Sequence, residues 1–130
     1  MTDDMLGDPV DRAKLDRFVR EIVKAVPALE PALEEHLDFM GGLHSHMFFG
    51  DVVRWAQGEA EKSPPSQDLK QLLLILDLAY PRADVRIREL VAFSFIENID
   101  RTSPLRSQLL PNLKALDDEF RHGAGGWIYG

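Results

Sequence analysis

The segment from Val85 to Ile99, VRIRELVAFSFIENI, constrains the fold more than any other part of the sequence. Its apolar residues fall on nearly every side of a helix, and a helix that is apolar almost all round belongs inside a protein. Four charged residues interrupt it, and it is shorter than the roughly 20 apolar residues that a bilayer requires. We therefore expect residues 84–99 to form a central helix that the other helices pack against.

Elsewhere the apolar residues recur at the 3.6-residue spacing of amphipathic helices, and no strand-like alternation persists. Asp8 and Ser66 are suited to cap helix N-termini, while Pro27 and Gly41 are suited to end helices. The predicted helices run from Pro9 to about Ala25, from Leu29 to Met40, from within His44–Gly50 to Ala60, from Ser66 to Ala79, and from Leu105 to Phe120.

Two residues lie inside these patterns against the usual helix preferences. Gly50 costs roughly 1 kcal/mol relative to alanine in a helix interior, which predicts a close helix contact or a kink there. Pro111 predicts that the last helix is kinked or begins near that residue.

These patterns predict an all-α fold in a single domain covering residues 1–130, a bundle of five to six helices around the central helix. Residues 1–7 are expected to form a flexible tail. Residues 123–130, GAGGWIYG, contain too much glycine for a helix. Their aromatic residues Trp127 and Tyr129, with Ile128, are expected to fold back onto the body, because a loose tail would expose them.

The composition narrows the classes of partner and cofactor. The 130-residue chain has no cysteine, which excludes disulfides and thiolate metal sites, and its formal net charge is -7. An acidic protein repels nucleic acid and anionic lipid, so we expect neither as a partner and favour a basic protein. Met1–Pro9 is acidic without an apolar run, which predicts a cytoplasmic protein. We find no motif for a nucleotide or other cofactor and no catalytic nucleophile motif.

His44, His46 and Asp51 form the densest group of polar residues in an apolar setting. Two histidines and a carboxylate are suitable ligands for zinc or another divalent ion. The alternative is structural, with the histidines capping or hydrogen-bonding the start of the third helix. No spacing typical of a metalloprotease supports the metal site, and His36 and His122 are distant in sequence.

Asp51, Arg54 and Trp55 are a candidate partner-binding patch. Asp51 and Arg54 are three residues apart on one helix face, and arginine and tryptophan dominate interface hot spots. The structural alternative is an ordinary helix ion pair beside a half-buried tryptophan.

Ser94, Glu97 and Asn98 place polar groups on the central helix. An unpaired buried polar group costs roughly 1 to 3 kcal/mol, so we expect these to find partners, with Glu97 pairing with Arg54 or a histidine. The alternative is that Glu97 and Asn98 line a cleft and bind a ligand.

Two acidic clusters are expected to be solvated faces or a complementary surface for a basic partner. The first lies on the second helix and the second near the end of the chain: Glu30, Glu34, Glu35 and Asp38; Asp117, Asp118 and Glu119.

Two segments resemble the signature of an uncharacterised family of small bacterial all-helical proteins. In HSHMFFGDVVRW the matching residues are His46, Phe48, Phe49, Gly50, Asp51 and Arg54. In RELVAFSFIENI they are Ser94, Phe95, Glu97 and Asn98, and a leucine-rich helix like LLPNLKAL follows. The resemblance implies an all-helical fold, and similar small acidic proteins occur among the immunity proteins of bacterial toxin systems. His44 and the aromatic tail lie outside the pattern.

Three functions follow as hypotheses. The first is a non-enzymatic protein-binding domain, most concretely an immunity-type protein that occludes a basic toxin domain. The second is a small metal-dependent or acid–base enzyme using His44, His46, Asp51 and Glu97. The third is a structural module that forms a homodimer through its aromatic tail.

Overall fold

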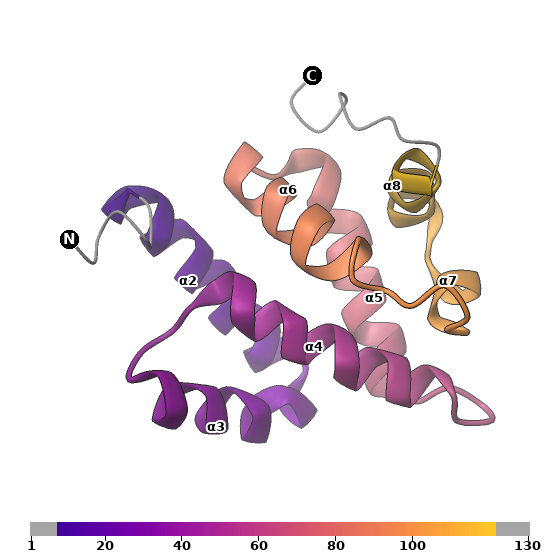
Figure 1. The fold of residues 1–130 in the computed structure, drawn as a ribbon, viewed down its shortest axis with the longest axis horizontal. Coiled ribbons are helices and arrows are strands. Elements are labelled where there is room, and N and C mark those ends of the chain that lie inside the picture. Colours follow the sequence, from indigo (N-terminus) through magenta and orange to yellow (C-terminus); the bar gives the residue numbers. More distant parts are fainter. Residues whose placement is uncertain (1–7, 122–130) are drawn as a thin grey trace.

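The computed structural model describes residues 8–121, and these form an all-α fold without strands (Figure 1). The α-helices are α2 (Pro9–Ala25), α3 (Glu30–Met40), α4 (Ser45–Ala60), α5 (Gln67–Ala79), α6 (Val85–Val91), α7 (Leu105–Gln108) and α8 (Pro111–Arg121). Short 3₁₀ turns occur at Pro27–Leu29 and Tyr80–Arg82. The all-α prediction is confirmed. The predictions for residues 1–7 and for the aromatic tail 123–130 lie outside the described residues.

Local sequence signals account for several helix ends. The carboxylate of Asp8 accepts the backbone N–H of Val10 at 2.8 Å, and Pro9 begins α2. The hydroxyl of Ser66 accepts the backbone N–H of Leu69 at 3.2 Å and caps α5. Gly41 ends α3 in the left-handed region, with φ of 72°, which side chains disfavour. These predicted boundaries are confirmed.

The predicted central helix is α6 continued by a π-helical turn, η3 (Ala92–Ile96). It packs against α2, α4 and α8, and Leu90, Val91 and Phe95 are fully buried. The helix is not buried on every side, because Phe93 is 37% exposed. It also ends at Ile96 rather than at Ile99, in a wide turn that a 3.6-residue pattern does not encode.

The core contains a chain of aromatic rings from three helices. Phe49 of α4 lies 6.3 Å from Phe95 of η3 and 6.4 Å from Phe18 of α2, centroid to centroid. Phe49 and Phe95 are fully buried, so the central helix is joined to α2 through α4. Within residues 8–121, no helix is long and apolar enough to cross a membrane.

Three sequence expectations are settled by packing. Nothing lies within 4 Å of a Cβ built on Gly50, so the close helix contact, one of the two alternatives predicted there, does not form. The last predicted helix is divided by the extended backbone of Leu109, and α8 begins at Pro111, which was one of the two alternatives. Asp117 was expected on a solvated face, but it is only 2% exposed, and two arginines pair with its buried carboxylate.

Candidate functional site

A groove of about 530 Å³ lies between α3 and α4. These helices run side by side and are joined by the short 41–44 connection (Figure 1). From α3 the groove is lined by Ala32, Glu35, His36, Phe39 and Met40, and from α4 by Met47, Asp51 and Arg54. It therefore contains two of the predicted site residues, Asp51 and Arg54.

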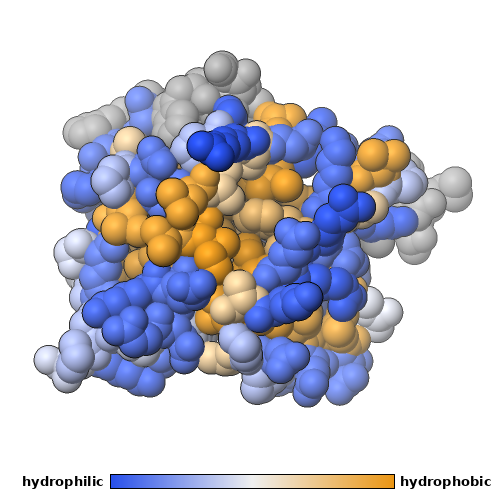
Figure 2. All heavy atoms as spheres, turned by 180° about the vertical axis from the view of Figure 1, so that it is seen from behind, coloured by the Kyte–Doolittle hydropathy of each residue, from blue (hydrophilic) through white to orange (hydrophobic). Residues whose placement is uncertain are grey.

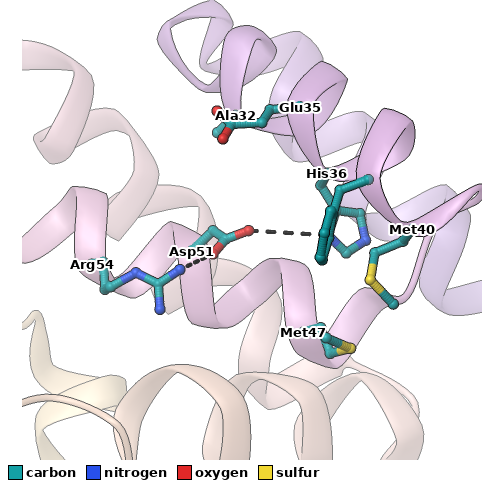
Figure 3. A pocket seen from close by; sticks show the side chains of 8 residues that line it. Ala32, Glu35, His36, Met40, Met47, Asp51 and Arg54 are labelled. Carbon is teal, nitrogen blue, oxygen red and sulfur yellow. Dashed lines mark hydrogen bonds and ion pairs between the residues drawn. The ribbon is translucent and has the colours of Figure 1, made fainter.

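The apolar side chains of the groove are unusually exposed. Phe39 is 85% exposed and Met47 is 56% exposed, while Met40 is partly buried. Figure 3 shows the thioethers of Met40 and Met47 at the same end of the groove, one from each helix. Exposed phenylalanine next to flexible methionine is typical of surfaces that bind another molecule.

His36 is the buried polar residue of this groove and is 6% exposed. Its Nε2 accepts the backbone N–H of His44 at 3.0 Å, so Nε2 carries no proton and the neutral ring bears its hydrogen on Nδ1. Nδ1 lies 4.0 Å from Oδ2 of Asp51. Burial lowers the pKa of His36, and the attraction of Asp51 opposes that change. His36 thus ties the start of α4 to α3 in its neutral form.

Asp51 lies between a buried histidine and an exposed arginine. Figure 3 shows its carboxylate placed between His36 of α3 and Arg54 of its own helix. Arg54 donates a hydrogen bond to Oδ1 of Asp51, and its side chain is 74% exposed. Arg54, one of the two partners expected for Glu97, pairs instead with Asp51, and Glu97 lines a different cavity. The arginine is held at the edge of the groove, where a partner can reach it.

The other predicted site residues lie apart from this groove. Trp55 is half-buried and packs against the core. Nδ1 of His46 lies 2.5 Å from the hydroxyl of Ser94, which joins α4 to η3. Desolvation of the imidazole lowers the pKa of His46, and nearby Glu89 opposes that change. His46 therefore faces Ser94, whereas His44 and Asp51 both lie beside His36. Among residues 8–121 there is no group of three side chains suited to hold a metal ion.

The polar residues at the end of the central helix are also separate from the groove. Ser94 is buried and bonded to His46, and the amide of Asn98 donates to the carbonyl of Ser94 at 3.1 Å. Glu97 is exposed and lines a different cavity beside α8. Ser94 thus has the structural partners predicted for it.

Sequence reasoning missed His36 and the apolar rim as site residues. The signal for His36 was its position in the apolar stripe of α3 between Leu33 and Met40, where a histidine must find a polar partner. Phe39 lies outside that apolar stripe, on the acidic side of the helix. An apolar residue on a charged face is informative because packing within the domain does not explain it.

The exposed charged residues of α3 are all acidic. Glu30, Glu34, Glu35 and Asp38 are all exposed, and the helix contains no lysine or arginine. The prediction that this cluster is solvated is confirmed. Of these four residues Glu35 lines the groove, so the α3 wall of the groove carries negative charge.

Fold and groove define the class of the protein, an all-α domain with an apolar, acid-edged groove between two consecutive helices. Residues 19–123 match the family described as Domain of unknown function (DUF7674), and the chain belongs to that family. Neither the curated proteins nor the solved structures contain a match to the sequence.

Proposed function

We propose that this protein is a non-enzymatic protein-binding domain whose α3–α4 groove binds a basic amphipathic helix of a partner. The observation that carries the proposal is Phe39, an aromatic side chain that is 85% exposed at the edge of a groove. Apolar anchors of a partner helix would cover Phe39 and Met47. This arrangement is a helix-in-groove mode of recognition.

Charge selects the type of partner helix. The four exposed acids of α3 and the net charge of -7 favour a segment that carries lysine or arginine beside its apolar anchors. Complementary charge accelerates association and discriminates against acidic competitors. Arg54, fixed by Asp51, offers one positive group that would receive a carboxylate or carbonyl of the partner and set its orientation.

Within this class we propose an immunity-type role, in which the bound partner is a basic toxin domain whose active surface is occluded. The resemblance of the HSHMFFGDVVRW and RELVAFSFIENI segments to small bacterial helical proteins supports this reading, together with the acidic groove. The enzyme hypothesis receives less support, because His46 bonds to Ser94 and Glu97 lies at another cavity.

A binding experiment with defined peptides tests the groove. The probe is a fluorescently labelled amphipathic helix built from leucine and lysine, and the matched probe replaces lysine with glutamate. We expect the lysine peptide to bind and the glutamate peptide to bind at least about tenfold more weakly. Equal affinity for both peptides would contradict the proposal that the acidic residues at the groove determine peptide affinity.

Two matched variants locate the binding surface. Figure 2 shows apolar side chains gathered on the face turned away from the viewer in Figure 1. Leu78 of α5 is 62% exposed and does not line the groove. Phe39→Ala is expected to weaken lysine-peptide binding by about tenfold or more, as for a hot-spot aromatic. Leu78→Ala removes a comparably exposed apolar residue outside the groove and is expected to leave the affinity unchanged. Equal losses in the two variants would reject the groove.

The immunity role has its own test. If the gene directly upstream encodes a toxin, co-expression of this protein should protect cells from it, and Phe39→Ala should reduce protection while Leu78→Ala does not. If the purified toxin and this protein do not bind each other, the immunity role is rejected. The peptide-binding result would not be affected.

A further inference from the structure

A second cavity, of about 550 Å³, lies on the other side of the central helix, between the end of η3, the 97–106 segment and α8. Its walls include Glu97, Arg101, Arg106, Asp117, Phe120 and Arg121. Three arginines converge here in a chain whose net charge is -7. The residues that line this cavity are all different from those that line the groove between α3 and α4.

Arg106 is fixed in position before any ligand arrives. Its guanidinium donates to the carbonyl oxygens of Ile99 at 2.9 Å and Asp100 at 3.2 Å. One of its nitrogens also lies 3.4 Å from Oδ1 of Asp117, and the side chain is only 17% exposed. A guanidinium held in this way loses little conformational entropy when it binds an anion.

The carboxylates at the cavity do not neutralise all of its arginines. Asp117 is shared between Arg106 and Arg121, whose Nε lies 3.6 Å from Oδ2. Arg121 also pairs with Asp118 at 3.0 Å, outside the cavity lining. Arg101 is exposed and makes no ion pair within residues 8–121. The lining itself holds Glu97 and Asp117 against three arginines, and Asp118 just outside it balances part of the charge of Arg121. Among the described residues, Arg101 is the arginine of the lining whose charge is left without an ion pair.

An apolar surface lies beside these charges. Phe120 is half-buried and meets Phe93 edge to face, with ring centroids 5.9 Å apart. The contact fixes the ring of Phe120 at the cavity wall, where it offers apolar area to the body of a ligand.

We propose that this cavity binds a small phosphate monoester. Arg101, Arg106 and Arg121 would contact the phosphate oxygens, and Phe120 would contact the organic group. Guanidinium groups bind phosphate through paired, charge-assisted hydrogen bonds. A dianion suits several convergent arginines better than a monocarboxylate does. Glu97 opposes binding, which makes its removal informative.

The test is calorimetric titration of the full chain with phenyl phosphate at constant ionic strength, with benzoate as the matched carboxylate. We expect phenyl phosphate to bind and benzoate to bind at least about fivefold more weakly. Arg101→Gln should weaken phenyl phosphate binding by about fivefold or more, whereas Glu97→Gln should strengthen it. Both residues are exposed, so the variants are expected to fold, and circular dichroism checks this.

Arg82→Gln is the control, because Arg82 is an exposed arginine outside the cavity. It should leave phenyl phosphate binding unchanged. Absence of binding, equal binding of benzoate, or equal effects of Arg101→Gln and Arg82→Gln would overturn the proposal. Phe39→Ala should bind phenyl phosphate normally, so this result is independent of the function proposed for the α3–α4 groove.

Discussion

The side-chain carboxylate of Asp77, on α5, accepts the backbone N–H of Leu113, in the first turn of α8, at 2.9 Å. The amide of Asn112 also donates to the backbone carbonyl of Asp77 at 2.9 Å. Asp77 is only 6% exposed. The N-terminus of α8 is therefore capped by a different helix, and this cap positions the helix that carries Asp117, Phe120 and Arg121.

Asp77→Ala is expected to lower the free energy of unfolding by about 1 to 3 kcal/mol, because a buried N–H loses its acceptor. Urea denaturation measures the change. Asp77→Asn keeps an acceptor oxygen and should lower the free energy of unfolding by less than Asp77→Ala does. Glu21→Ala, an exposed acid on α2, is the control and should change stability by less than about 0.5 kcal/mol. Equal stability of the Asp77→Ala variant and the native protein would reject the cap.

Gly50→Ala is expected to stabilise the protein by about 0.5 to 1 kcal/mol, because a helical glycine with space around its Cβ gains from alanine. Gly41→Ala is the matched comparison and should destabilise it, since Gly41 has φ of 72°. Thermal unfolding of both variants tests whether the two substitutions change stability in opposite directions. A destabilised Gly50→Ala variant would mean that α4 requires glycine for a reason other than packing.

The effects of Phe49→Ala and Phe39→Ala on stability should distinguish a core residue from a residue of the binding surface. Phe49 is fully buried between Phe18 and Phe95, so its truncation should cost about 3 to 5 kcal/mol. Phe39 is 85% exposed, and its truncation should change stability by less than about 0.5 kcal/mol. A large loss for Phe39→Ala in chemical denaturation would show that Phe39 is needed for folding.

Stability should fall as the pH is lowered from about 7.5 to about 5.5. Burial lowers the pKa of His36, and desolvation lowers that of His46, from the ordinary value of 6.5. The unfolded chain then binds more protons than the folded one, so the stability present above pH 6.5 is lost as the pH falls through the folded values. A His36→Gln/His46→Gln double variant should show a smaller change in urea midpoint. An unchanged pH dependence would contradict this assignment.

The helices were predictable where the signal is local. Asp8, Ser66 and Gly41 act within one turn of their own position, so their spacing from apolar residues places α2, α3 and α5 closely. The π-helical turn Ala92–Ile96 was not predictable in this way, because its hydrogen bonds shift by one residue without changing the apolar pattern.

The candidate site was predictable only in part for the same reason. Asp51 and Arg54 are neighbours on one helix, and their ion pair follows from spacing. The approach of His36 to Asp51 depends on how α3 packs against α4, and the burial of Asp117 depends on Arg106 from another helix. Such contacts are set by tertiary packing, which periodicity along a single sequence does not specify.

The most direct measurement of the proposed groove uses the methyl signals of methionine. Met40 and Met47 line the groove from α3 and α4, and Met1 and Met5 are the other methionines of the chain. In protein labelled at the methionine methyls, titration with the leucine–lysine peptide should shift the Met40 and Met47 signals together, with one saturation curve. Binding of the peptide without movement of these two signals would contradict the account.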